Sequence, residues 1–410
     1  MQAQAPSKFH EHLTQRANLK NTRYGWLRLT PAYSVHLVAE LLDSHDETNP
    51  IVLDPFCGTG TTALVCAERG IESDTTDINP FLIWLANAKT RNYELSDISE
   101  FEHWAEKLIS KLVDNIDPEW LPDIFQIDKW WDKPVLNRLS QLMLSINALD
   151  VSGSVSDLLK IAFCRVMIEQ SNASFSHQSM SLKKKENGHE NGHLFNGNLF
   201  DSAWRNAVSY ISQSADSLIQ RRPNVYRCDA RELSSQLNKN YYSCVITSPP
   251  YPNRMSYIRE LRPYMYWLGF LETAREASEL DWEAIGGTWG FATSRVGKWE
   301  PEKVIDIPFS EFPTILSRIA ESGDLLSRYV HKYFYDMKGH VAGLFEVVRP
   351  GGKIHYIVGN SKFYDVVLPV EHIFAGLFKE AGFTDVEVKT IRKRSSKKEL
   401  FEFVVSATKS

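Results

Sequence analysis

Residues 247–251, Thr-Ser-Pro-Pro-Tyr, form the stretch of this 410-residue chain whose residue types and order are best suited to chemistry. They end the apolar run 244–246, which predicts a buried strand that opens into a rigid loop. Two consecutive prolines fix φ and lack a backbone N–H, so we expect their carbonyls to lie outside any strand ladder. Tyr251 can stack on a planar ring while Ser248 and the Pro249 carbonyl accept hydrogen bonds from an exocyclic amine. A proline-rich turn with a surface tyrosine is the alternative.

A glycine-rich turn follows a second short apolar strand, within residues 51–63. Its spacing, G-x-G-x-x-A from Gly58, allows backbone to approach a ligand and directs helix N-terminal amides toward it. The next predicted strand, residues 71–77, ends in Asp77, at the distance expected of a carboxylate that holds ribose hydroxyls. Taken alone, the glycines would fit a dinucleotide site equally well, or no site.

Together the two stretches resemble the S-adenosylmethionine-dependent amino-methyltransferases of DNA. The cofactor motif of that family, D-P-F-x-G-x-G, matches residues 54–60, and its catalytic motif, S/D/N-P-P-Y/F, matches residues 248–251. The resemblance implies S-adenosyl-L-methionine as cofactor and double-stranded DNA as substrate. Cytosine-N4 members usually carry serine where adenine-N6 members carry aspartate or asparagine, so Ser248 favours cytosine and adenine is the first alternative. The catalytic residues implied are Ser248, Pro249, Pro250 and Tyr251.

The resemblance also implies which residues hold the cofactor. Asp54 and donors of the glycine turn are expected to hold the methionine part, and Asp229 the adenine amino group, although its carboxylate would equally cap a short helix. Ile78 would lie against the adenine ring. Residues 30–31 would pack over the methionine end, with an ordinary capped helix as the alternative. The expected cofactor-binding residues are Asp54, Phe56, Gly58, Gly60, Thr61, Asp77, Ile78, Asp229, Thr30 and Pro31.

Direct in-line methyl transfer is the mechanism that these residues favour. The lone pair of an exocyclic amine is delocalised into its ring, so acceptors that pyramidalise the nitrogen and a near-attack geometry supply much of the rate. Methylation at carbon 5 would need a cysteine nucleophile, usually after proline, and the chain has no Pro-Cys pair. RNA or a protein glutamine amide as substrate, and a non-catalytic nucleic-acid-binding subunit, are the further alternatives.

The charge of the chain is not that of an obvious nucleic-acid binder. With a formal net charge of −5 and a pI near 6.2, phosphate contacts would have to come from local basic clusters. Arginines between aromatic residues after the catalytic loop suit phosphates and an extruded base, with packing of an aromatic-rich helix as the alternative. The nucleic-acid-binding residues expected are Arg254, Arg259, Arg262, Lys183, Lys184 and Lys185. Two further basic clusters, each of which would also fit a solvated surface, are Arg16, Lys20, Arg23 and Arg28, and Arg392, Lys393 and Arg394 with Lys397 and Lys398.

Other features of the sequence argue for a cytoplasmic protein without metal. The five cysteines lack metal-type spacing, residues 1–14 have no apolar signal core, and no window approaches 20 apolar residues. Residues 189–193 match the H-E-x-x-H zinc pattern, but Asn191 and Gly192 disfavour the helix that it requires. We therefore expect a basic loop there and no metal site.

We expect an α/β fold with a Rossmann-like class I methyltransferase sheet, mostly parallel with an antiparallel C-terminal strand, and a large helical insertion. Residues 1–90 are assigned to an N-terminal arm and the cofactor-binding half, and residues 223–410 to the catalytic half. Residues 91–222 form the insertion, which serves recognition or dimerisation or only buries a sheet face. A second, irregular insertion is expected at about residues 272–325, over the site. The recognition sequence, a cognate restriction endonuclease and a homodimer are left open.

Overall fold

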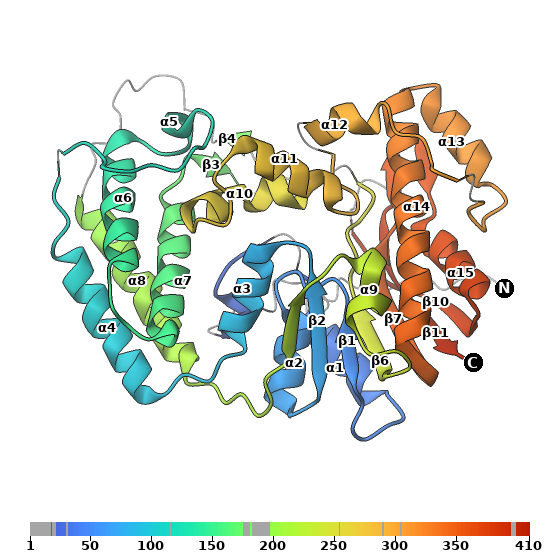
Figure 1. Ribbon diagram of the computed structural model, residues 1–410, viewed down its shortest axis with the longest axis horizontal. Helices are drawn as coiled ribbons and strands as arrows, with labels where there is room; N and C mark the ends of the chain where they lie inside the picture. The colour runs from blue at the N-terminus through green and yellow to red at the C-terminus, as the bar shows by residue number, and fades with distance from the viewer. Residues whose placement is uncertain are drawn as a thin grey trace.

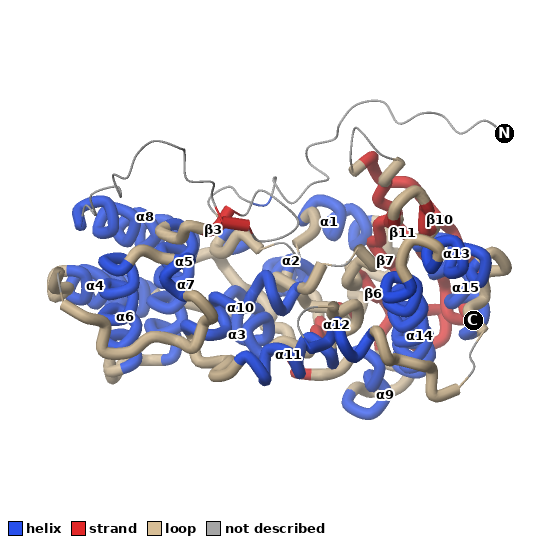
Figure 2. Tube along the Cα trace, turned by 90° about the horizontal axis from the view of Figure 1, so that it is seen from above, coloured by secondary structure: helices blue, strands red, loops and turns tan. Residues whose placement is uncertain are grey.

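The computed structural model describes residues 18, 22–29, 32–114, 116–174, 181–182, 197–253, 255–288, 291–303, 306–394 and 399–410. The molecule is elongated, with a group of helices at one end and a sheet flanked by helices at the other (Figures 1 and 2). None of the helices within these ranges is both long and apolar enough to cross a lipid bilayer.

A seven-stranded sheet in the order β10-β11-β7-β6-β1-β2-β5 organises the fold. Neighbouring strands from β7 to β5 are parallel, whereas β11 is antiparallel to both β7 and β10. The mostly parallel α/β sheet with an antiparallel C-terminal strand is therefore confirmed. In chain order the strands are β1 (Val52–Asp54), β2 (Ser73–Asp77), β5 (Asn224–Arg227), β6 (Tyr242–Thr247), β7 (Val348–Gly359), β10 (Phe383–Lys393) and β11 (Phe401–Lys409).

Helices cover both faces of this sheet, because its central strands are apolar on both sides; every residue of β6 is buried. One face packs against α1 (Val35–Asp43) and α2 (Thr61–Arg69). The other packs against α9 (Leu233–Gln236), α14 (Asp324–Val347) and α15 (Val370–Ala381). Two short strands, β8 (Ser361–Phe363) and β9 (Val366–Leu368), form a separate hairpin.

The predicted insertion is helical. Its helices are α4 (Leu95–Ile109), α5 (Ile127–Trp130), α6 (Lys133–Asn147), α7 (Gly153–Glu169) and α8 (Gly197–Ala215). A capping box between Glu94 and Asp97 starts α4. These helices share one apolar core with α3 (Pro80–Lys89) and α10 (Tyr257–Trp267), so the insertion is packed onto the sheet half of the molecule.

The second insertion differs from the sequence expectation of an irregular segment. It contains α11 (Ala274–Glu283), α12 (Phe291–Val296) and α13 (Phe312–Ala320). Thr273 caps α11 by accepting from the Glu276 N–H, and Ala277 and Leu280 bury its apolar side, so amphipathic helix rather than loop forms here. In Figure 1, α10 and α11 run from the helical insertion toward α12 and α14.

Arg23 joins the N-terminal segment to both halves of the molecule. Its side chain is 1% exposed, and its guanidinium donates to five backbone carbonyls at the ends of α3 and α8. A buried guanidinium that is fully engaged in this way is unavailable to a phosphate. Its inclusion in a basic surface cluster was therefore wrong. The five carbonyls belong to Lys89, Arg91, Ser214, Ala215 and Ser217.

Candidate active site

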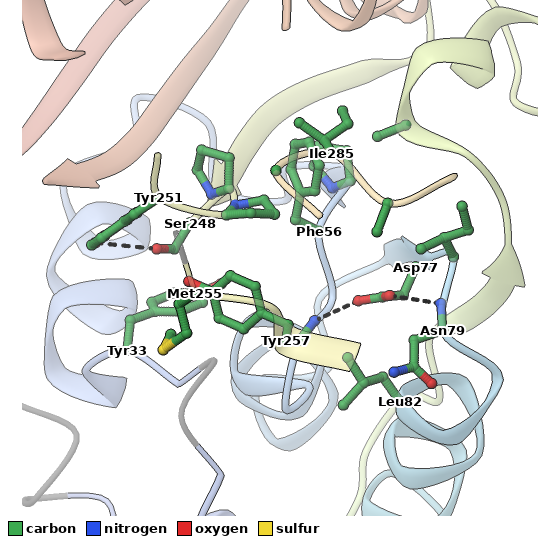
Figure 3. A pocket seen from close by; sticks show the side chains of 18 of the residues that line it. Tyr33, Phe56, Asp77, Asn79, Leu82, Ser248, Tyr251, Met255, Tyr257 and Ile285 are labelled. Carbon is green, nitrogen blue, oxygen red and sulfur yellow. Dashed lines mark hydrogen bonds between the residues drawn. The ribbon is translucent and has the colours of Figure 1, made fainter. Parts of the chain in front are cut away.

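A cavity of about 600 Å³ lies at the carboxyl ends of the parallel strands. Residues that follow β1, β2, β5 and β6 all line it, which is the edge where parallel sheets bind ligands. Both predicted motifs open onto it: Phe56 and Asp77 lie toward one end, and Ser248 and Tyr251 toward the other (Figure 3). The two motifs singled out from the sequence thus face a shared space. The predicted site residues among its lining are Phe56, Gly58, Asp77, Ile78, Asp229, Ser248, Pro249, Pro250 and Tyr251.

The glycine turn is held against the end of β2 by Asp77. Its carboxylate accepts from the backbone N–H of Gly58 at 3.0 Å and from that of Asn79 at 2.9 Å. Gly58 and Gly60 have φ of 52° and 76°, left-handed values that favour glycine, and Gly60 begins α2. Burial raises the pKa of Asp77 to about 6, an effect opposed by the backbone hydrogen bonds. The turn therefore presents its backbone to the cavity in a fixed conformation.

Asp54, Gly60 and Thr61 are predicted cofactor residues that do not line the cavity. The Asp54 side chain is 1% exposed and accepts from the Thr247 hydroxyl at 2.6 Å, the Tyr33 hydroxyl at 3.0 Å and the Phe56 N–H at 3.1 Å. It therefore joins the ends of β1 and β6 to the segment before α1. A direct contact between this carboxylate and the cofactor stays a prediction. The observed hydrogen bonds show that Asp54 holds the neighbouring segments in position.

Asp54 should make stability depend on pH. Burial raises its pKa from 3.8 to about 7, so the folded chain holds a proton that the unfolded chain has lost between these values. The Asp54 contribution to stability should therefore fall as pH rises, by about 1.4 kcal/mol per pH unit in this window. In urea unfolding measured from about pH 5 to about pH 6.5, the slope of stability against pH should be more positive in Asp54→Asn than in the wild type by about this amount. Asp43→Asn, at the exposed end of α1, is the control, and an unchanged slope in Asp54→Asn would contradict the assignment.

The Pro-Pro loop is anchored from α14 and β7. The Pro250 carbonyl lies outside the strand ladders, as expected, but it accepts from the Tyr333 hydroxyl at 2.7 Å and is therefore already occupied. The Ser248 hydroxyl donates to the Ile357 carbonyl at 3.1 Å. Pro249 lines the cavity between these two anchors. Its carbonyl remains the predicted acceptor for an amine.

Tyr251 is held by residues of the C-terminal strands. Its hydroxyl donates to Glu402 Oε1 at 3.1 Å, and the Arg394 guanidinium carbon lies 4.9 Å from the centre of its ring. Arg392 Nε is 2.6 Å from the other carboxylate oxygen of Glu402. The sequence reading placed both arginines in a surface basic cluster and missed Glu402. β10 runs parallel to β7, so the end of β10 lies at the ligand edge of the sheet. The position of the arginines at this strand end could therefore have indicated that they, and Glu402 opposite them, lie near the site.

The position of Asp229 is compatible with both roles expected from the sequence, a helix cap and a contact with the cofactor adenine. It lines the cavity, and it caps a 3-10 turn (Ala230–Glu232) by accepting from the Arg231 N–H at 2.9 Å. The Arg231 side chain also pairs with Asp229 at 2.6 Å and with Asp336 at 3.1 Å. The helix-cap interpretation is confirmed, and the contact with a cofactor adenine stays a prediction.

Behind Phe56 lies a buried histidine that the sequence reading did not single out. The rings of Phe56 and His340 meet edge to face at 4.8 Å. His340 Nδ1 lies 2.7 Å from the Ala230 carbonyl and Nε2 lies 2.6 Å from the Tyr356 hydroxyl. Burial lowers the pKa of His340 to about 4. A neutral imidazole thus supports the aromatic wall of the cavity.

A roof over the cavity comes from the second insertion, as its predicted position over the site implied. Asp281, Glu283 and residues 284–287, from the end of α11 and the loop after it, are part of the lining. A Cβ on Gly287 would lie 1.6 Å from the Asp281 carbonyl oxygen. Only glycine therefore permits this close turn of the roof loop.

Of the residues predicted to bind nucleic acid, the two that the structure describes do not line the cavity. Arg259 and Arg262 are half-buried on α10 outside its lining, and the Arg262 guanidinium lies 5.0 Å from the centre of the Trp130 ring. Trp267 on the same helix is 1% exposed, which supports the alternative of an aromatic-rich packed helix. The predictions that lie outside the described residues are Thr30, Pro31, Arg254, Lys183, Lys184, Lys185, the loop 189–193, and Arg16, Lys20, Lys397 and Lys398 of the two further basic clusters.

Comparison with known proteins finds similarity to DNA methyltransferases. A family model described as DNA methylase, of the N6/N4 type, matches residues 12–88. The chain is 22% identical to Type II methyltransferase M.AvaI of Nostoc sp. (strain PCC 7120 / SAG 25.82 / UTEX 2576), over 92% of this chain and 83% of the relative. It is 23% identical to Type II methyltransferase M.BsoBI of Geobacillus stearothermophilus, over 93% and 82%.

Among solved structures, one match is a Thermus thermophilus protein described provisionally as a DNA modification methylase, complexed with S-adenosyl-L-methionine. The two are 16% identical with a TM-score of 0.23, and the match covers 44% of this chain and 53% of that one. The family model spans the glycine turn and Asp77, and the relatives align over nine tenths of the chain. These matches support the N4/N6 amino-methyltransferase family of DNA, which the two sequence motifs resemble.

Proposed function

We propose that this protein is a site-specific DNA methyltransferase that modifies the exocyclic amine of cytosine, N4. The observation that carries the proposal is the shared cavity, which has the glycine turn and Asp77 at one end and the Ser248–Tyr251 loop at the other. A methyl donor and a planar amine held at these two ends would face each other. A duplex base reaches such an enclosed site only after leaving its stack.

The methyl donor is S-adenosyl-L-methionine, which supplies an electrophilic methyl group on a sulfonium. The residues present fit it: carboxylates suit ribose hydroxyls and an adenine amino group, and backbone amides of a glycine turn suit the methionine carboxylate. Asp77 would hold the ribose, Asp229 the adenine amino group, and the turn at Gly58 the methionine part. Ile78 and Phe56 would supply apolar contacts.

At the other end, the clamp would orient the amine. The Ser248 hydroxyl oxygen and the Pro249 carbonyl accept its two hydrogens and turn the nitrogen lone pair toward the donor. The bound donor would supply its methyl group to this nitrogen and would be left as a neutral thioether, and the amine would release one proton to water. Preorganised acceptors of this kind act without reorganisation at the moment of transfer. Tyr251 would stack on the base.

Serine at position 248 is the feature that favours cytosine over adenine. A hydroxyl carries no charge, and here it is already oriented by the Ile357 carbonyl. The test is digestion of unmethylated DNA to nucleosides after incubation with the protein and labelled cofactor, followed by mass spectrometry. N4-methylcytosine is the expected product. N6-methyladenine would show that the target base is adenine and not cytosine. Label found in RNA or protein in parallel reactions, and not in DNA, would show that DNA is not the substrate. The cytoplasmic location, a cognate endonuclease and a homodimer stay predictions.

Asp77→Asn should weaken binding of S-adenosyl-L-methionine about tenfold, because a charge-assisted hydrogen bond to the ribose becomes a neutral one. Asp74→Asn is the matched control: Asp74 lies on the same strand and bonds Tyr242 and Asn224 outside the cavity. Calorimetry with the cofactor measures both. Equal affinities for the two variants would show that the cofactor does not reach the end of β2.

A further inference from the structure

The hairpin of β10 and β11 reaches the same cavity as the Pro-Pro-Tyr loop. Arg392 and Arg394 lie at the end of β10, and Glu402 lies at the start of β11; all three line the cavity. This part of the chain belongs to neither of the two motifs. Its side chains lie beside Tyr251 at the end of the cavity assigned to the target base.

Glu402 is an 8% exposed carboxylate with partners for both of its oxygens. Oε1 accepts from the Tyr251 hydroxyl at 3.1 Å, and Oε2 accepts from Arg392 Nε at 2.6 Å. A buried carboxylate is costly unless it is paired and hydrogen-bonded, so this pairing fixes the place of Glu402. The hydroxyl of Tyr251 is thereby tied to the hairpin. Burial together with the Glu402 charge holds the pKa of Tyr251 well above its ordinary value, so the hydroxyl remains a donor.

Arg394 is held in place by the backbone around it. Its Nη1 donates to the Asn360 carbonyl at 3.1 Å, and its own backbone N–H donates to the Leu400 carbonyl at 2.7 Å. The Asn360 side chain in turn accepts from the Phe401 N–H at 2.8 Å. The guanidinium so fixed lies 4.9 Å from the centre of the Tyr251 ring, within the range of a cation–π contact.

Gly359, at the end of β7, shows how closely this pair is packed. A Cβ there would lie 2.2 Å from Arg394 Nη1 and 3.0 Å from a ring carbon of Tyr251. The strand end, the guanidinium and the ring are therefore in contact with no room for a methyl group. Tyr251 is enclosed on the hairpin side and has its hydroxyl bonded, so little rotation of the ring remains.

We propose that the C-terminal hairpin completes the target-base subsite, with Glu402 and Arg394 as positioning residues for Tyr251. Arg394 covers the ring on the hairpin side, so a planar base stacks on the side that faces Ser248 and the cavity. Glu402 sets the orientation of the ring through its hydroxyl. The proposal rests on the proposed function. It places Arg394, which belongs to a basic cluster in the sequence, at a half-buried position on the Tyr251 ring.

The test compares kcat and KM for unmethylated plasmid DNA at saturating cofactor. Glu402→Gln and Tyr251→Phe should each lower kcat about tenfold, the scale of one base–aromatic stacking contact. Because both break the same link, the double variant should lose no more than either single one. Arg394→Lys should retain more kcat than Arg394→Met, because lysine keeps a cation over the ring. Glu346→Gln, at an exposed ion pair with Lys239, should match the wild type.

Two controls separate positioning from damage to the fold. Calorimetry with S-adenosyl-L-methionine should be unchanged in Tyr251→Phe, and thermal unfolding should still show a cooperative transition, because the variant keeps the ring and loses only the hydroxyl link to Glu402. Unchanged kcat in Glu402→Gln, or losses that multiply in the double variant, would overturn the inference. So would an Arg394→Met variant that raises only KM for DNA, because that is the behaviour of a phosphate contact. A wild-type chain that transfers no methyl group to DNA would overturn the proposed function and this inference with it, whereas an active wild type with an unaffected Glu402→Gln would overturn the inference alone.

Discussion

Tyr251→Ala should lower methyl transfer to DNA by about 100-fold or more, while binding of S-adenosyl-L-methionine is largely retained. The variant removes the stacking surface, which is worth about 1–3 kcal/mol per base, and also the contacts that hold the loop beside Ser248. The glycine turn and Asp77 lie at the other end of the cavity and keep their own hydrogen bonds. Rates with labelled cofactor and calorimetry of cofactor binding measure the two effects separately.

Pro249→Ala tests the neighbouring acceptor in the same assay, because a freer backbone would no longer hold its carbonyl toward the amine. Tyr364→Ala is the matched control, since Tyr364 is 55% exposed and lies outside the cavity lining. Full activity of Tyr251→Ala on DNA would show that the methyl acceptor binds elsewhere.

Arg23→Met should lower the free energy of unfolding by about 3–5 kcal/mol, the cost of leaving buried polar partners without their charge-assisted donor. Methionine fills part of the volume but donates to none of the five carbonyls that the guanidinium engages. Those carbonyls have little access to water, since Arg23 itself is 1% exposed. Urea unfolding followed by circular dichroism gives the free energy.

Arg28→Met is the control for this loss, because Arg28 is an exposed residue of the same segment. Its stability should match that of the wild type within about 0.5 kcal/mol. A similar small change in Arg23→Met would mean that the N-terminal segment does not join the two halves of the molecule.

Much of the sheet half was predictable, because local pattern and topology agree there. The strand predicted at residues 71–77 is β2, which ends at Asp77 as expected, and the apolar run 244–246 lies within β6. The turn after β1 requires positive φ, which glycine adopts readily, and a carboxylate at the end of a parallel strand lies at the ligand edge of the sheet. Both features could therefore be predicted from the sequence. Parallel strands then place Asp77 and Ser248 at one edge, and the structure puts them on one cavity.

Contacts that depend on long-range packing were not predictable. In the sequence, Arg23, Arg392 and Arg394 look like ordinary basic residues. Only the fold shows that Arg23 is buried among backbone carbonyls and that Arg394 lies on the ring of Tyr251. The tie from Tyr333 to the Pro250 carbonyl joins residues 83 apart in the chain, beyond the reach of any local pattern. The amphipathic helix α11 was missed because glycines at 286, 287 and 290 dominate the reading of that stretch.

Helix α10 begins at the cavity and ends inside the core of the insertion. Tyr257 at its start lines the cavity, whereas Trp267 at its end meets Trp131 and Phe163 at ring separations of 5.8 and 5.5 Å. The helical insertion therefore cannot be exchanged between relatives as a free-standing cassette. A chimera cut at residues 91 and 222 alone would leave Trp267 facing foreign side chains and would displace the cavity wall, so an engineered graft must carry residues 257–271 with it.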